Sequence, residues 1–183
     1  MVSVKPSVMK VSLLCSVILV QSRLISPAQL PPLSTQPVVM AGLGTGAAPF
    51  RAFIQERAWQ KAQGMEVGPL LYYFGSRYRS KEYLYGEEIE AYLREGILTH
   101  AGLAFSRDTK KKVYIQHLIS QDADLIAQSM QGGAFYLCGP TWPVPDVYEA
   151  LVKSFVNTGK TVEQAQAYIE ELKDDERYVL EVY

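Results

Sequence analysis

A glycine-rich turn at residues 42–46, Gly-Leu-Gly-Thr-Gly, joins a short apolar run to a segment of helical periodicity that begins at Ala47. Glycines allow a backbone to approach a ligand closely, and a helix N-terminus offers free N–H groups and a favourable dipole to anions. Pro49 suits the first turn of that helix, where its missing donor is no loss. The turn predicts a diphosphate site, although a tight turn without a ligand would use the same glycines. Its spacing is neither the GxGxxG of common dinucleotide dehydrogenases nor the GK[ST] of phosphate-binding NTPase loops.

A second group of chemically capable residues lies at positions 106–116. A serine hydroxyl, a guanidinium and an ammonium can converge on a phosphate, and a tyrosine ring can stack on a purine. These groups are present as Ser106, Arg107, Lys112 and Tyr114, with Gln116 close behind. Together they predict a 2′-phosphoadenosine site, the feature that separates NADPH from NADH. A solvated basic loop would explain the consecutive lysines alone, but the position expected for the adenosine end of a dinucleotide favours the phosphate site.

Three further residues stand at the ends of apolar runs. Cys138 precedes Gly139, and Glu181 and Tyr183 belong to the last run of the chain. A lone cysteine in a strand is usually a small buried hydrophobe. A tyrosine at a chain end indicates little. By residue type and spacing alone, none of the three carries a functional prediction.

Apolar runs alternate with segments of helical periodicity from residue 37 onward. The predicted strands cover residues 37–41, 70–74, 97–105, 134–138 and 178–183. The first predicted helix starts at residue 47. The others cover 83–95, 114–130 (interrupted near Ser120), 145–157 and 161–173, and the last of them follows a capping box of Thr161 and Gln164. Strands that are apolar on both faces and separated by helices predict an α/β fold, a doubly wound parallel sheet of about five strands with helices on both faces. Ligands of such sheets bind at the carboxyl ends of the strands, near the point where strand order reverses. The turns after the first, third and fourth strands are therefore the candidate sites.

Composition excludes several classes of function. The 183 residues are 48% hydrophobic and 20% charged, with 18 Lys and Arg against 19 Asp and Glu. A formal net charge of −1 provides no general basic field to attract nucleic acid. The two cysteines, Cys15 and Cys138, and the two histidines, His100 and His117, lack the spacing of a metal site or a disulfide framework. We therefore expect no metal, no nucleic-acid or membrane partner, and a reducing, cytoplasmic compartment.

Four segments together resemble the NADP-binding domain of the ferredoxin–NADP reductase and diflavin reductase superfamily. They are AGLGTGAAPF at 41–50, FGSRYRSKEYLYGEE at 74–88, AFSRDTKKKVYIQH at 104–117 and YLCGPTWPVPD at 136–146. The resemblance covers residues 36–183 and is closest to the flavoprotein components of fungal assimilatory sulfite reductases. It implies an oxidoreductase domain that passes hydride from NADPH to FAD for the reduction of sulfite to sulfide.

The resemblance also implies roles for individual residues. The diphosphate of NADPH would bind at Gly44, Thr45 and Gly46, with Arg77 nearby. The 2′-phosphate and the adenine would bind at Ser106, Arg107, Lys112, Tyr114 and Gln116. Cys138 would lie beside the nicotinamide carbon that donates hydride, and Glu181 would stabilise the charge that develops there. Tyr183 would stack on the flavin and move aside for the nicotinamide.

The organisation of the chain follows from the same resemblance. Residues 37–183 would form the NADP-binding domain. Residues 1–36 would hold a remnant of the end of an FAD domain at 3–10, an apolar insertion at 11–29 and a proline-rich linker. The insertion is expected to be a translated intron rather than a secretory signal, and transcript sequencing across residues 10–30 tests this hypothesis.

Partners are implied as well: the FAD and FMN domains of a flavoprotein, and a sirohaem-containing sulfite reductase subunit. The chain alone would bind NADPH without transferring hydride, because almost all of the FAD domain is missing from it. Two other functions stay open: a nucleotide-binding fragment without catalysis, and the corresponding domain of an NADPH reductase that serves a haem protein. Restoration of flavin reduction by a separately supplied FAD domain would separate the enzyme fragment from the non-catalytic one.

Overall fold

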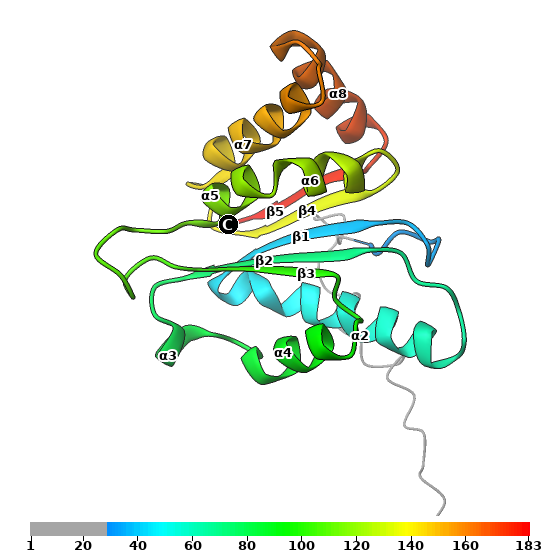
Figure 1. Ribbon diagram of the computed structural model, residues 1–183, viewed down its shortest axis with the longest axis vertical. Helices are drawn as coiled ribbons and strands as arrows, with labels where there is room; N and C mark the ends of the chain where they lie inside the picture. Colours follow the sequence, from blue (N-terminus) through cyan, green and yellow to red (C-terminus); the bar gives the residue numbers. More distant parts are fainter. Residues whose placement is uncertain (1–28) are drawn as a thin grey trace, which may run out of the picture.

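The computed structural model describes residues 29–183; the predicted flavin-domain remnant and the apolar insertion up to residue 28 lie outside the described residues. The described chain forms a parallel sheet of five strands in the order β3-β2-β1-β4-β5 (Figure 1). The strands are β1 Val38–Leu43, β2 Leu70–Ser76, β3 His100–Phe105, β4 Ala134–Gly139 and β5 Tyr178–Val182. From β1 the chain builds toward one edge through β2 and β3, and then toward the other edge through β4 and β5. The predicted doubly wound α/β fold is confirmed.

Helices cover both faces of this sheet (Figure 1). One face carries α2 Ala48–Ala62, α3 Arg79–Glu82 and α4 Gly86–Arg94, and a short 3-10 helix, η1 Gly44–Ala47, joins β1 to α2. The other face carries α5 Ile115–Gln121, α6 Ala123–Met130, α7 Val144–Asn157 and α8 Val162–Asp174. Among residues 29–183, no helix has both the length and the apolar character needed to cross a membrane.

The central strand β1 shows why both faces must be covered. All six of its residues are buried. Val39, Ala41 and Leu43 pack on the side of α5–α8, and Val38 and Met40 pack on the side of α2–α4. Successive side chains of a strand point to opposite faces, and each fully buried Val or Leu contributes about 1.5–3 kcal/mol. An uninterrupted apolar run is therefore what a strand at the centre of a parallel sheet requires.

The start of α4 differs from the predicted start at residue 83. Tyr85, immediately before the helix, adopts a left-handed conformation with φ of 59°. Tyr83 turns its ring onto Phe74 and Phe105 instead of continuing a helical turn. The preceding four-residue helix α3 has no counterpart among the predicted elements. Packing against the sheet therefore decides the local conformation of this segment.

The predicted helix over 114–130 is two helices, α5 and α6, which meet at Asp122, so the interruption predicted near Ser120 is confirmed two residues further along the chain. The carboxylate of Asp122 accepts a 3.0 Å hydrogen bond from the hydroxyl of Tyr73, on β2.

The capping box predicted for the last helix is confirmed. The backbone N–H of Thr161 donates to the side chain of Gln164 at 2.9 Å, and the return bond is 3.2 Å.

The segment that leads into β1 is held by two side chains of the domain. Arg57, a fully buried residue of α2, donates hydrogen bonds of 2.9 Å to the carbonyl oxygens of Pro31 and Leu33. The hydroxyl of Tyr136 donates to the carbonyl of Gln29 at 2.7 Å. The proline-rich stretch thus follows a defined path across the domain, while the domain boundary at residue 37 stays a prediction.

Candidate functional site

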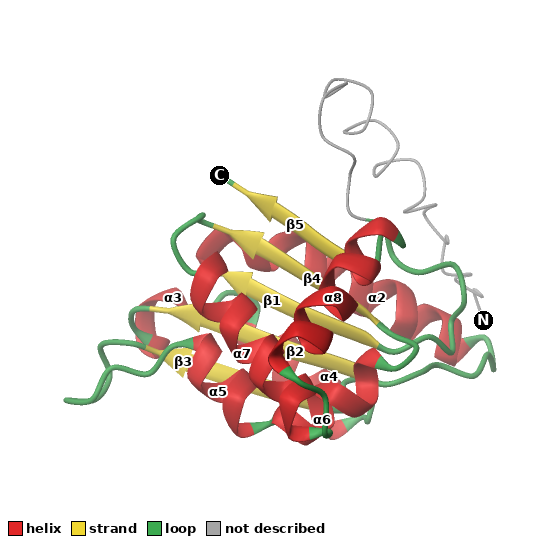
Figure 2. Ribbon diagram, turned by 90° about the horizontal axis from the view of Figure 1, so that it is seen from above, coloured by secondary structure: helices red, strands yellow, loops and turns green. Residues whose placement is uncertain are grey.

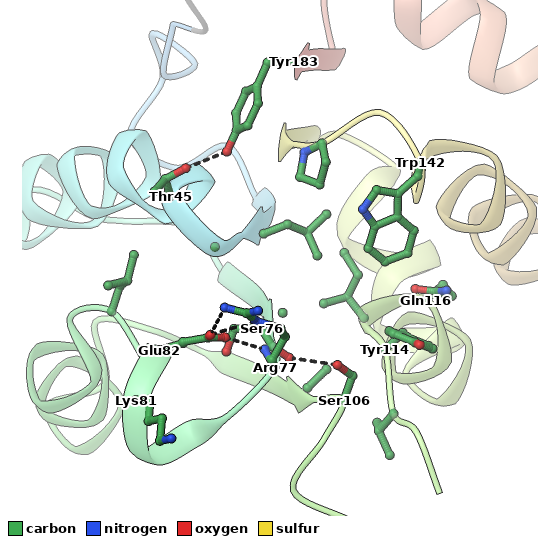
Figure 3. Close-up of a pocket in the computed structure, with 18 residues that line it drawn as sticks. Thr45, Ser76, Arg77, Lys81, Glu82, Ser106, Tyr114, Gln116, Trp142 and Tyr183 are labelled. Carbon is green, nitrogen blue, oxygen red and sulfur yellow. Dashed lines mark hydrogen bonds and ion pairs between the residues drawn. The ribbon is translucent and has the colours of Figure 1, made fainter.

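A cavity of about 530 Å³ opens at the carboxyl edge of the sheet, where the arrowheads of all five strands lie in Figure 2. The segment after each strand contributes at least one residue to its walls. In the order of the strands from β1 to β5, these include Thr45, Arg77, Ser106, Trp142 and Tyr183. These side chains converge from separate connections (Figure 3). Strand order reverses between β1 and β4, which is where ligands of open α/β sheets bind. The three candidate turns therefore meet at one cavity.

The glycine-rich turn contributes Gly44 and Thr45 to the cavity, but not Gly46. Gly44 has φ of +56°, a conformation that favours glycine, and a Cβ added there would meet no atom within 4 Å. Gly46 is buried instead against the end of β4, where an added Cβ would lie 2.0 Å from the carbonyl oxygen of Cys138. Gly44 thus leaves open space beside the cavity, and Gly46 allows η1 to pack closely against the end of β4.

Arg77 lines the cavity and is held by an acidic neighbour. Its Nε donates a 2.8 Å hydrogen bond to Glu82, and its backbone N–H donates another of 2.8 Å to the same carboxylate. The paired guanidinium keeps the pKa of the Glu82 carboxyl below its ordinary value, and Glu82 in turn raises the pKa of Arg77. A phosphate bound beside Arg77 would therefore share this guanidinium with Glu82.

The structure separates the residues of the 2′-phosphoadenosine site predicted at 106–116 into two sets. Ser106, Tyr114 and Gln116 line the cavity, whereas Arg107 and Lys112 are exposed on the loop between β3 and α5 and do not line it. The backbone of Ser106 is anchored by a 3.0 Å hydrogen bond from its N–H to the carbonyl of Ser76. The side chains of Arg107 and Lys112 would therefore approach a ligand from the rim of the cavity, unlike Ser106 and Tyr114 of the same loop.

Two buried polar atoms of the cavity wall have no hydrogen-bond partner among the described residues: Oε1 of Gln116 and Oγ of Ser76. The amide of Gln116 is oriented because its Nε2 donates a 3.0 Å bond to the carboxylate of Asp146, which leaves Oε1 without a partner. A buried polar group without a partner costs about 1–3 kcal/mol, so such groups call for an explanation. A ligand whose polar groups reach these atoms would supply the missing partners.

The cavity is also lined by residues that are absent from the predicted site, among them Ser76, Glu82 and Trp142. All three belong to the segments that carry the family resemblance, residues 74–88 and 136–146. That membership is the only signal that could have found them. Their side-chain types alone are equally consistent with surface positions.

The third predicted group gathers at the ends of β4 and β5. Cys138 lies opposite Glu181 in the strand register, and the backbone N–H of Tyr183 donates a 3.1 Å hydrogen bond to the carbonyl of Gly139. The ring of Tyr183 reaches back over the glycine-rich turn, where its hydroxyl lies 2.6 Å from the hydroxyl oxygen of Thr45 (Figure 3). Tyr183 lines the cavity, whereas Cys138 and Glu181 do not.

The thiol of Cys138 is expected to be a slow nucleophile at neutral pH. Burial raises the pKa of this thiol, and the nearby carboxylate of Glu181 raises it further. In a Cys15→Ser background, alkylation of Cys138 by iodoacetamide should therefore rise only at pH values above the ordinary thiol pKa. Glu181→Gln removes the repulsion between the carboxylate and the thiolate, so the midpoint should fall but stay above the ordinary value. A midpoint that Glu181→Gln leaves unchanged would show that the carboxylate does not act on the thiol.

Comparison with known proteins identifies the family of this chain. Residues 40–145 match the oxidoreductase NAD-binding domain family, and this range runs from β1 to the start of α7. A sulfite reductase [NADPH] flavoprotein component of Saccharomyces cerevisiae is 50% identical over 100% of this chain and 16% of its own length. A probable sulfite reductase [NADPH] flavoprotein component of Schizosaccharomyces pombe is 47% identical over 86% of this chain and 16% of its own length. Human NADPH–cytochrome P450 reductase is 44% identical over 86% of this chain and 24% of its own length.

The chain thus spans a small part of each of these relatives. The match nonetheless includes the glycine-rich turn, the β3–α5 loop and the end of β4, the three connections that meet at the cavity. The resemblance predicted from the four segments is confirmed. This chain belongs to the oxidoreductase NAD-binding domain family.

Proposed function

We propose that this chain is the NADPH-binding part of a flavin-dependent reductase that passes hydride from NADPH to FAD. The observation that carries the proposal is the cavity at the strand-order reversal, with the unpartnered Oε1 of Gln116 and Oγ of Ser76 in its wall. The names of the relatives support it, since they describe NADPH-dependent enzymes and, for the sulfite reductases, flavoprotein components.

The residues of the cavity suit the parts of NADPH. Gly44 and Thr45 supply backbone N–H groups and a hydroxyl at the start of a helix, which suits a diphosphate. Gly46 would support them from behind by packing on β4, and Arg77 would add a positive charge. Ser106 would bind the 2′-phosphate inside the cavity, with Arg107 and Lys112 approaching from the rim. Tyr114 would stack on the adenine, and Gln116 would hydrogen-bond the adenosine.

At the other end, Cys138, Glu181 and Tyr183 are proposed to act at the nicotinamide. When bound, NADPH supplies the hydride and FAD accepts it; the chain's own residues orient the reacting ring and control access to it. The raised pKa of Cys138 keeps its thiol neutral there, and Glu181 would stabilise developing positive charge. Tyr183 is the proposed FAD contact of this chain, and its hydrogen bond to Thr45 must break before the ring moves.

The wider function follows from the same relatives. Sulfite reduction is favoured over service to a haem protein because the sulfite reductase component of Saccharomyces cerevisiae is 50% identical and the human cytochrome P450 reductase 44%. The partners would be FAD and FMN domains and a sirohaem-containing subunit. The domain would begin at residue 37, and its compartment would be the cytoplasm. Without those flavin domains, we expect the chain to bind NADPH but not to transfer its hydride.

Calorimetric titration of the chain with 2′,5′-ADP and with 5′-AMP tests the nucleotide site. 2′,5′-ADP should bind about a hundredfold more tightly, because each hydrogen bond to a charged group contributes about 1.5–3 kcal/mol and each 1.4 kcal/mol is a factor of ten. Equal, weak binding of both nucleotides would mean that the basic loop is only a solvated surface. Absence of binding would remove the proposed function.

A further inference from the structure

The indole of Trp142 stands at one end of the cavity, in the connection between β4 and α7. It is 59% exposed although it lines the cavity. Figure 3 shows it beside Tyr114 and Gln116, at the end opposite Thr45 and Tyr183. Building on the NADPH site proposed above, we propose that Trp142 packs against the adenine ring of the bound nucleotide, in the corner that it forms with Tyr114.

The relation between the two rings supports this contact. The ring centroids of Trp142 and Tyr114 are 6.0 Å apart, and the ring planes are inclined at 76°. Two rings at such an angle form a corner, in which a flat heterocycle can lie on the face of one ring with its edge against the other. Because the rings come from different connections, β4–α7 and β3–α5, a purine in this corner would bridge the two sides of the cavity.

The loop that carries Trp142 is stiff. Pro140 and Pro143 flank it, and proline restricts both its own backbone and that of the residue before it. The backbone N–H of Val144 donates a 3.2 Å hydrogen bond to the carbonyl of Thr141, which closes a turn around Trp142. The backbone of such a turn loses little conformational freedom when a ligand covers the side chain that it carries.

A polar group beside this corner suits a purine that carries an amine. The unpartnered Oε1 of Gln116 is an acceptor, and its orientation is set by Asp146, on the helix that follows Trp142. An exocyclic amine such as that of adenine would donate to it. One exposed indole means little by itself on a protein surface. The indole of Trp142, however, adjoins an aromatic ring and an unpartnered acceptor.

The sequence contains two tryptophans, so the full chain offers a direct measurement. Trp59 lies on α2, is 57% exposed and does not line the cavity. In Trp59→Phe, titration with 2′,5′-ADP should change the emission of Trp142 with the midpoint that calorimetry gives. Trp142→Ala should weaken 2′,5′-ADP binding about tenfold, the scale of one base stacked on one aromatic ring. Trp142→Phe should lose less than about threefold, since it keeps an aromatic face, and Trp59→Phe should bind like the original chain.

The outcomes separate this inference from the function on which it rests. If calorimetry shows binding while Trp142 emission stays constant and Trp142→Ala keeps the original affinity, the contact does not exist, and the nucleotide site stands without it. If no variant binds 2′,5′-ADP and the original chain does not either, the proposed function and the inference both fail. Emission is measured on a chain with Trp142 intact, so the test holds even if Trp142→Ala fails to fold.

Discussion

Replacing Gly46 with alanine is expected to destabilise the protein by about 3 kcal/mol, at the upper end of what overpacking usually costs. A Cβ at this position would lie 2.0 Å from the carbonyl oxygen of Cys138 and 2.5 Å from its carbonyl carbon. These are backbone atoms of β4, which is paired with β1 and β5 and cannot rotate aside as a flexible side chain can. The variant must move either the glycine-rich turn or the end of the strand. Urea unfolding followed by circular dichroism measures the loss.

Gly132→Ala is the matched control. This glycine lies between α6 and β4, and an added Cβ would meet no atom within 4 Å. Its free energy of unfolding should stay within about 0.5 kcal/mol of the original value, as for most surface substitutions. If Gly46→Ala is as stable as Gly132→Ala, the end of β4 can retreat, and close packing is not the reason for a glycine at position 46.

Ser106→Glu is expected to weaken the binding of 2′,5′-ADP at least about a hundredfold, because it replaces a donor to the phosphate with a charge of the same sign. The Ser106 side chain lines the cavity, and its backbone N–H is tied to the carbonyl of Ser76 at 3.0 Å, so a longer acidic side chain would still start from the cavity wall. Binding of 5′-AMP, which has no 2′-phosphate, should change far less. Calorimetry with both nucleotides gives the two affinities.

Gln128→Glu controls for the added charge. Gln128 is an exposed residue of α6 and does not line the cavity, yet its substitution changes the net charge by the same amount. It should leave both affinities within about twofold, since exposed charges separated by more than about 10 Å are largely screened at 0.1 M salt. If Ser106→Glu weakens both nucleotides equally, the serine does not face the 2′-phosphate, and the proposed orientation of the nucleotide is wrong.

Local pattern accounts for the elements whose residues interact mainly with near neighbours in sequence. The capping box joins Thr161 and Gln164, three positions apart, and the apolar run of β1 needs only burial on both faces. The alternation of such runs with helical segments, joined by a glycine-rich turn, was enough to predict the parallel sheet and the edge at which the cavity opens. The start of α4 was not predictable in this way, because the ring of Tyr83 packs on side chains of β2 and β3.

From the sequence alone we thus predicted the α/β class, the family and seven of the residues that line the cavity. The contacts that those residues make depend on the tertiary structure. Gly46 packs on Cys138, Thr45 meets Tyr183, and the amide of Gln116 is oriented by Asp146. Each of these pairs is separated by tens of residues along the chain or more, so its contact depends on the register of β4 and β5 and on the seating of α7. No local pattern carries that information, because hydrophobic periodicity specifies which face of an element is buried but not which atoms of another element it meets.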